Sequence, residues 1–124
     1  MLPKAAINMS DVRDIATIHV AALENDNASG KRFIVTIEKA HGFIELAQIL
    51  KSNGYDKVSI RLAPNFLLKL MANFSADLKG MRPFIGNTFN GDVSETMKTF
   101  KWKSISLKKT VSDTAESIIQ AMKS

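Results

Sequence analysis

The sequence has no cysteine, which excludes a disulfide framework, a thiolate nucleophile and any metal site ligated by cysteine. It also lacks an apolar run of about 18 residues, so no segment is expected to cross a membrane. The first residues hold no signal-peptide core, which makes the cytoplasm the expected location. Hydrophobic residues are 45% and charged residues 23% of the 124, as in ordinary globular proteins, and one domain over residues 1–124 is expected.

Arginine is scarce, because thirteen of the seventeen basic residues are lysine. The net charge of +5 is compatible with an anionic partner, but planar recognition of phosphate or guanine favours arginine. The lysines between residues 98 and 109 flank Trp102 and form the candidate surface for an anion or nucleic acid. They are Lys98, Lys101, Lys103, Lys108 and Lys109. Lysines on a solvated helix face give the same pattern, and we prefer that interpretation, which disfavours nucleic acid as a partner.

Motifs for metal or phosphate binding are missing. The two histidines, His19 and His41, lack the spacing of metal ligands, and the six glycines match no phosphate-binding fingerprint. The atom types of a catalytic triad occur in Ser10, Asp11, Asp14 and His19. They share one short segment, whereas triads are assembled across a fold, so we expect the two aspartates to cap a helix instead.

Apolar spacing predicts five helices, over residues 15–23, 43–50, 64–74, 94–100 and 107–122. Two to four short strands are predicted as well, and the sequence places two of them. Residues 32–37 are apolar on both faces, which is typical of a strand covered on two sides, and residues 58–62 alternate as in a half-exposed strand. The expected fold class is therefore α/β, mostly helical with a few short strands. Because few strands could flank residues 32–37, the sheet is expected to be incomplete. An exposed strand of this type would favour pairing with a second copy as a homodimer.

Six segments then point to a family. They are residues 10–16 (SDVRDIA), 19–25 (HVAALEN), 28–34 (ASGKRFI), 92–94 (DVS), 100–103 (FKWK) and 106–110 (SLKKT). In order and spacing they resemble the VDVRDVA, AHxxALE, AxGxRYI, DNSKA, LGWKP and SLEET segments of extended short-chain dehydrogenase/reductases. The dihydroflavonol-4-reductase-like branch is the most similar, and the wider group includes NAD-dependent epimerases. The departures are Ser10 for a usual Val, Glu95 for a Lys or Arg, and Lys101 for the Gly before Trp102.

The resemblance implies that residues 1–124 are the C-terminal, substrate-binding portion of a Rossmann-type enzyme that reduces a ketone or aldehyde with NADP(H) or NAD(H). Family members bind the cofactor on an N-terminal domain through GxxGxxG and use a YxxxK pair. Neither motif occurs here, since Ser59 stands four residues after Tyr55, the only tyrosine. The expectation is that the N-terminal dinucleotide-binding part is absent, that these residues bind no cofactor or metal, and that they are inactive alone.

The long segment of residues 75–92 is the first place to look for a ligand. The resemblance implies that it forms one wall of the substrate pocket. The candidate substrate-binding residues are Phe66, Met81, Arg82, Phe84 and Ile85. An apolar cleft with one cation suits a carbonyl-bearing substrate, and Arg82 also fits the phosphate-contacting Arg of nucleotide-sugar members. The alternative is that the two phenylalanines belong to the core and that Arg82 is solvated. A rival function is a stand-alone interaction module that binds through residues 98–109.

Overall fold

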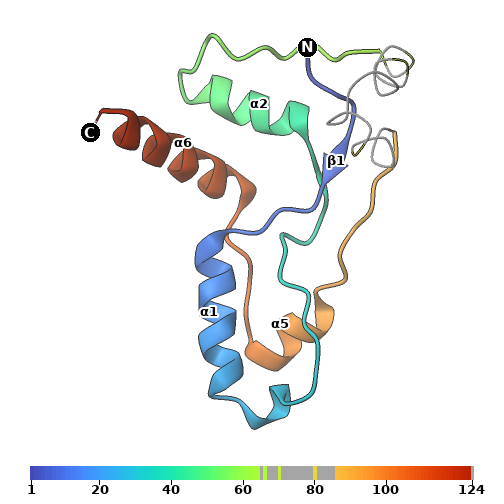
Figure 1. Cartoon of the computed structure of the whole chain (residues 1–124), viewed down its shortest axis with the longest axis vertical. Coiled ribbons are helices and arrows are strands. Elements are labelled where there is room, and N and C mark those ends of the chain that lie inside the picture. Colours follow the sequence, from blue (N-terminus) through green and yellow to red (C-terminus); the bar gives the residue numbers. More distant parts are fainter. Residues whose placement is uncertain (65, 67–69, 71–79, 81–85, 124) are drawn as a thin grey trace.

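The structure, a computed structural model, describes residues 1–64, 66, 70, 80 and 86–123. In that part of the protein it is a small α/β fold with four α-helices and a two-stranded sheet (Figure 1). The elements are β1 (Ala6–Ile7), α1 (Val12–Leu23), the 3-10 helix η1 (Asp26–Ala28), β2 (His41–Gly42), α2 (Phe43–Ser52), α5 (Ser94–Phe100) and α6 (Leu107–Lys123). The α/β class is confirmed. Among the described residues, no helix is long and apolar enough to span a membrane.

The sheet is small because only β1 and β2 form it. They run antiparallel, with Ala6 opposite Gly42 and Ile7 opposite His41. The pairing continues past β1, where the N–H of Ile37 donates to the carbonyl of Met9 at 2.7 Å. At the other end, Leu2 forms an isolated parallel bridge with Leu62. The first nine residues therefore run between two segments that are distant in sequence.

The helices predicted from apolar spacing are confirmed where the structure describes them. Helix α1 begins one turn before Ile15, because the Asp11 carboxylate, rather than that of Asp14, accepts from the Arg13 N–H at 2.9 Å and caps it. Helix α2 ends before Gly54, whose φ of 90° is the left-handed conformation that glycine adopts most readily. The Ser106 hydroxyl accepts from the Lys109 N–H at 3.4 Å at the start of α6, as predicted.

Two groups of helices pack separately. Helix α6 lies against α2, and Figure 1 shows this pair above α1. Helix α5 lies beside α1, and the ring of Phe100 at its end meets Phe33 edge-on, with ring centroids 4.8 Å apart. The connection over residues 101–106 joins the two groups. It therefore positions α6 relative to α1.

The prediction of a strand at residues 32–37 is wrong, and its expected burial on both faces is wrong with it. The segment is irregular, and Ile34 is 52% exposed. Side-chain hydroxyls make bonds that a neighbouring strand would make: Thr96 Oγ1 donates to the Ile34 carbonyl at 2.7 Å, and Ser10 Oγ to the Val35 carbonyl at 2.5 Å. Hydroxyl groups thus partly replace a strand partner.

The prediction of a strand at residues 58–62 is also wrong. Apart from the bridge at Leu62, this segment has no ladder partner among the described residues, and Ile60 is exposed. Most of the predicted helix over 64–74 and most of the loop over 75–92 lie outside the described residues. Residues 86–92, which are described, carry no helix or strand.

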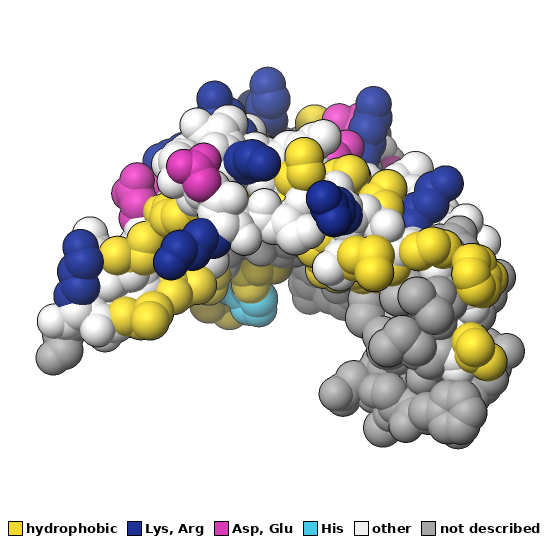
Figure 2. Space-filling view, turned by 90° about the horizontal axis from the view of Figure 1, so that it is seen from above, with side chains coloured by type: hydrophobic (Ala, Val, Ile, Leu, Met, Phe, Trp, Pro, Cys, Tyr) yellow, Lys and Arg dark blue, Asp and Glu magenta, His cyan; other side chains and the backbone are white. Residues whose placement is uncertain are grey.

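The buried core is built mainly from small side chains. Its hydrophobic members are Ala5, Ile18, Ala28, Ile37, Ala47, Ala63, Val93 and Val111. Thr96 is the most deeply buried of the described residues, at 1% exposure. Larger apolar side chains lie outside, and Figure 2 shows several along the arm that carries the C-terminal helix. Much apolar surface is therefore left uncovered.

Candidate functional site

The predicted substrate pocket falls mostly on residues that the structure does not describe. Met81, Arg82, Phe84 and Ile85 lie outside the described residues. Phe66 is described and is 73% exposed, so it does not belong to the core. What the structure does bring together is a polar cluster at the junction of α1, α6 and the connection over residues 101–106. Its members are Asp11, Arg13, Asp14, Trp102, Thr110 and Asp113.

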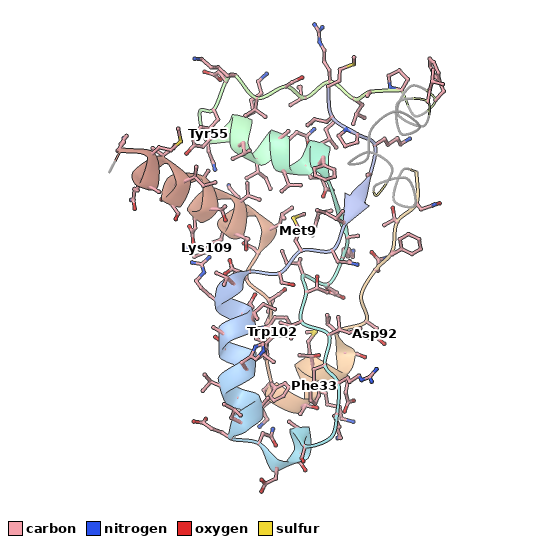
Figure 3. All side chains as sticks on the ribbon, viewed as in Figure 1. Met9, Phe33, Tyr55, Asp92, Trp102 and Lys109 are labelled. Atoms are coloured by element: carbon pink, nitrogen blue, oxygen red, sulfur yellow. The ribbon has the colours of Figure 1, made fainter. Side chains whose placement is uncertain are left out.

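Asp14 forms the centre of the junction because both of its oxygens accept hydrogen bonds. The indole Nε1–H of Trp102 donates to Oδ1 at 3.0 Å, and the backbone N–H of Ile105 donates to Oδ2 at 2.9 Å. Asp14 is 6% exposed. Figure 3 shows Trp102 lying beside α1. The carboxylate therefore joins the first turn of α1 to the segment that leads into α6.

Asp11 makes the second link between α1 and α6. Arg13 Nε donates to Oδ1 at 2.8 Å and Nη2 to Oδ2 at 2.7 Å, and the hydroxyl of Thr110 donates to Oδ2 at 2.8 Å. The Arg13 hydrogen bonds hold the pKa of Asp11 well below its ordinary value of 3.8, although burial of the carboxylate acts in the opposite direction. The same bonds raise the pKa of Arg13. Asp11 is therefore ionised and fully engaged.

Asp113 extends this network along α6. Arg13 Nη1 donates to its Oδ2 at 2.6 Å, and Lys109 Nζ lies 2.9 Å from the same oxygen. Hydrogen bonds from Lys109 and then from Arg13 lower the pKa of Asp113. The groove at this junction has a volume of about 510 Å³, and Asp11, Arg13 and Asp113 line it. Each of these charged groups is therefore already paired within the junction.

The triad atom types noted in the sequence are used structurally. Ser10 Oγ is engaged with the Val35 carbonyl, and the ring Nδ1 of His19 lies 2.7 Å from the Ile15 carbonyl in the preceding turn. His41 Nδ1 lies 2.7 Å from Glu45 Oε2, an exposed pair one helical turn apart. Within the part of the protein that the structure describes, no group of three His, Cys, Asp or Glu side chains could hold a metal.

The lysines between 98 and 109 are divided among several elements. Lys98 lies on α5, Lys101 and Lys103 on the connection, and Lys108 and Lys109 on α6. Lys109 is paired with Asp113. The other four are exposed, and no ion pair links them to another described residue.

Sequence reasoning missed the contact between Asp14 and Trp102. A signal was present at Lys101, which stands where the LGWKP pattern that the sequence resembles has glycine. Lys101 has φ 49° and ψ 37° and ends α5, which makes it the one non-glycine residue in the left-handed region among the described residues. This left-handed turn precedes Trp102 directly. The sequence pattern that could have predicted this junction is therefore a position that favours glycine, followed directly by tryptophan. Its partner is an aspartate far away in the sequence.

Comparison of the sequence and structure with protein-family models, with curated proteins and with solved structures gave no match.

Proposed function

We propose that this protein is the substrate-binding portion of an extended short-chain reductase of the dihydroflavonol-4-reductase-like branch, which reduces a ketone or aldehyde with NADP(H) or NAD(H). The proposal rests on the six sequence segments that resemble that branch. The proposal also narrows the α/β fold class to one fold, the C-terminal part of a Rossmann-type enzyme. The structural observation that supports the proposal most is the hydrogen bond that Trp102 donates to Asp14.

That bond supports the proposal because it joins two of the resembling segments, residues 10–16 and 100–103. A second bond, from the Thr110 hydroxyl to Asp11, joins residues 10–16 to residues 106–110. The resemblance was read from local patterns that are about 90 residues apart in the sequence. Their direct contact gives the three segments one physical role, which is to hold α1 and α6 in place.

The backbone supports the proposal independently of side chains. The AxGxRYI and LGWKP patterns place glycine at residues 30 and 101. Gly30 has φ 70° and Lys101 has φ 49°, so both positions adopt the conformation that glycine favours. A family pattern with glycine at these two positions is therefore explained by the turns that end η1 and α5.

In such an enzyme, this portion would contact the carbonyl substrate, with Phe66, Met81, Arg82, Phe84 and Ile85 as the candidates. Hydride transfer also needs a bound nicotinamide cofactor and an oriented proton donor. The 124 residues contain neither GxxGxxG nor YxxxK, so the other half of the enzyme would supply both.

The first test is to sequence the DNA upstream of the codon for Met1. The expected result is a reading frame that continues into GxxGxxG and YxxxK motifs. A stop codon directly upstream would contradict the proposal. As a second test, the purified protein is mixed with NADPH and either aldehydes or flavonoid-like ketones, and we expect no oxidation of NADPH. Turnover that survives repeated purification would also overturn the proposal.

One observation favours the rival interaction module: Lys98, Lys101, Lys103 and Lys108 are exposed and carry no ion pair to a described residue. A module of this kind would bind nucleic acid with an affinity that falls steeply as salt rises. Fluorescence anisotropy with a labelled oligonucleotide over a salt series separates the two functions. The reductase proposal predicts at most weak binding.

A further inference from the structure

The sequence contains two asparagines that are followed directly by glycine, at Asn53–Gly54 and Asn90–Gly91. An Asn-Gly pair is chemically labile, because glycine has no side chain to obstruct attack of its backbone nitrogen on the asparagine amide carbon. The two pairs have different surroundings in this fold. One molecule therefore provides both a test site and its matched control.

Asn90 is exposed and lies in the irregular segment before α5. The backbone N–H of Ala40 donates to its Oδ1 at 3.0 Å. This bond polarises the amide carbon Cγ and would stabilise negative charge on Oδ1 when Cγ becomes tetrahedral. Among the described residues, the Gly91 N–H donates to no acceptor, so the attacking nitrogen is not held elsewhere.

Asn53 is held in a different way. Its Nδ2 donates to Ser112 Oγ at 2.7 Å, and the N–H of Gly54 donates to the Lys51 carbonyl at 3.1 Å. The nitrogen that would attack and the nitrogen that would leave are thus both engaged at the end of α2. Reaction at this site requires those hydrogen bonds to break first.

We propose that Asn90 is a site of spontaneous deamidation, promoted by the hydrogen bond from Ala40. The Gly91 nitrogen loses its proton to solvent base and attacks Cγ, which forms a C–N bond and places negative charge on Oδ1. Nδ2 then takes a proton from solvent, the electron pair on Oδ1 re-forms the carbonyl, and the Cγ–Nδ2 bond breaks, so that ammonia is released and a cyclic imide remains. Water adds to one imide carbonyl. Breaking of the Cγ–N bond gives aspartate, and breaking of the original peptide C–N bond gives isoaspartate.

The experiment uses the intact 124-residue protein in mildly alkaline buffer made with heavy-oxygen water, so that new products carry the label. One sample is folded and the other is in guanidinium chloride. Peptides that contain residues 53 and 90 are quantified by mass spectrometry. We expect Asn90 to react roughly three- to tenfold faster than Asn53 in the folded protein, and at a similar rate in denaturant. An equal or slower rate at Asn90 in the folded protein overturns the proposal.

A pair of variants tests the role of the Ala40 N–H. Ala40→Pro removes this donor, and Ala40→Gly keeps it. With the circular dichroism spectrum unchanged, Ala40→Pro should slow the reaction at Asn90 toward that of Asn53, and Ala40→Gly should not. An undiminished rate in a folded Ala40→Pro protein refutes promotion by the hydrogen bond. Should Ala40→Pro fail to fold, the comparison of folded and denatured wild-type protein decides the proposal.

Discussion

Asp14 is the residue on which the junction depends most, because each carboxylate oxygen accepts from a different N–H group. Asp14→Asn would turn an amide NH2 toward one of these donors and leave it unpaired in a buried site. We expect a loss of about 2 kcal/mol in the free energy of unfolding, measured with urea. Asp56→Asn, an exposed position, is the matched control and should change stability little. Equal effects of the two changes would contradict this role.

Lys101 stores a small amount of backbone strain, since its φ of 49° is unfavourable for a residue with a Cβ atom. Lys101→Gly removes this strain and should raise the free energy of unfolding by about 0.5–1 kcal/mol, after allowing for the greater freedom of glycine in the unfolded state. Lys103→Gly removes the same charge two residues away, without a left-handed backbone to relieve. A stabilisation that is equal in both variants would show that charge, and not backbone conformation, is responsible.

At the scale of elements, the Asp11 carboxylate makes the attachment of α6 to α1 dependent on pH. Its pKa is lower in the folded state than in the unfolded state, mainly because Arg13 donates to it. The stabilisation is therefore complete above the ordinary value of 3.8 and is lost as pH falls below it. We expect the urea midpoint to fall more steeply between pH 5 and about 3 in wild type than in Asp11→Asn. Matching slopes would contradict this assignment.

The elements also show what could be predicted from sequence. Helices α1, α2, α5 and α6 follow from apolar spacing and end signals within each segment, so local reasoning was sufficient. The strand at residues 32–37 was wrong because β-branched composition indicates a strand only when a neighbour exists to pair with it. Here the hydroxyls of Ser10 and Thr96, 25 and 62 residues from the carbonyls that they bind, take part of that place. No local pattern contains that information.

In the candidate site, too, only the features set by nearby residues could be predicted from the sequence. Capping by an aspartate at the start of α1 was predicted, because the capping side chain and the N–H group that it binds lie within one turn of each other. The partners of Asp14 and Asp11 were not, since Trp102 and Thr110 lie 88 and 99 residues away. The resemblance placed these segments in one family pattern but gave no contacts. Their hydrogen bonds appear only once the protein is folded.

At the scale of the whole molecule, many large apolar side chains of the described residues remain exposed, including Leu23 at 89% and Met122 at 81% exposure. Exposed apolar patches are typical of interaction surfaces. These side chains therefore support the proposal that a further part of an enzyme covers them.

When that covering part is not present, the same surface should favour association of one copy with another. The reason is no longer an open strand at residues 32–37, which the structure lacks, but apolar side chains such as Ile118 and Met122 on the outer half of α6. We expect the mass from light scattering to rise with protein concentration, and the thermal midpoint to rise with it, because association stabilises the folded state. Replacing Ile118 and Met122 by Lys should reduce both trends, whereas replacing Ser117 and Gln120 should not. A monomeric mass and a constant midpoint across the series would show that the exposed apolar surface does not pair with itself.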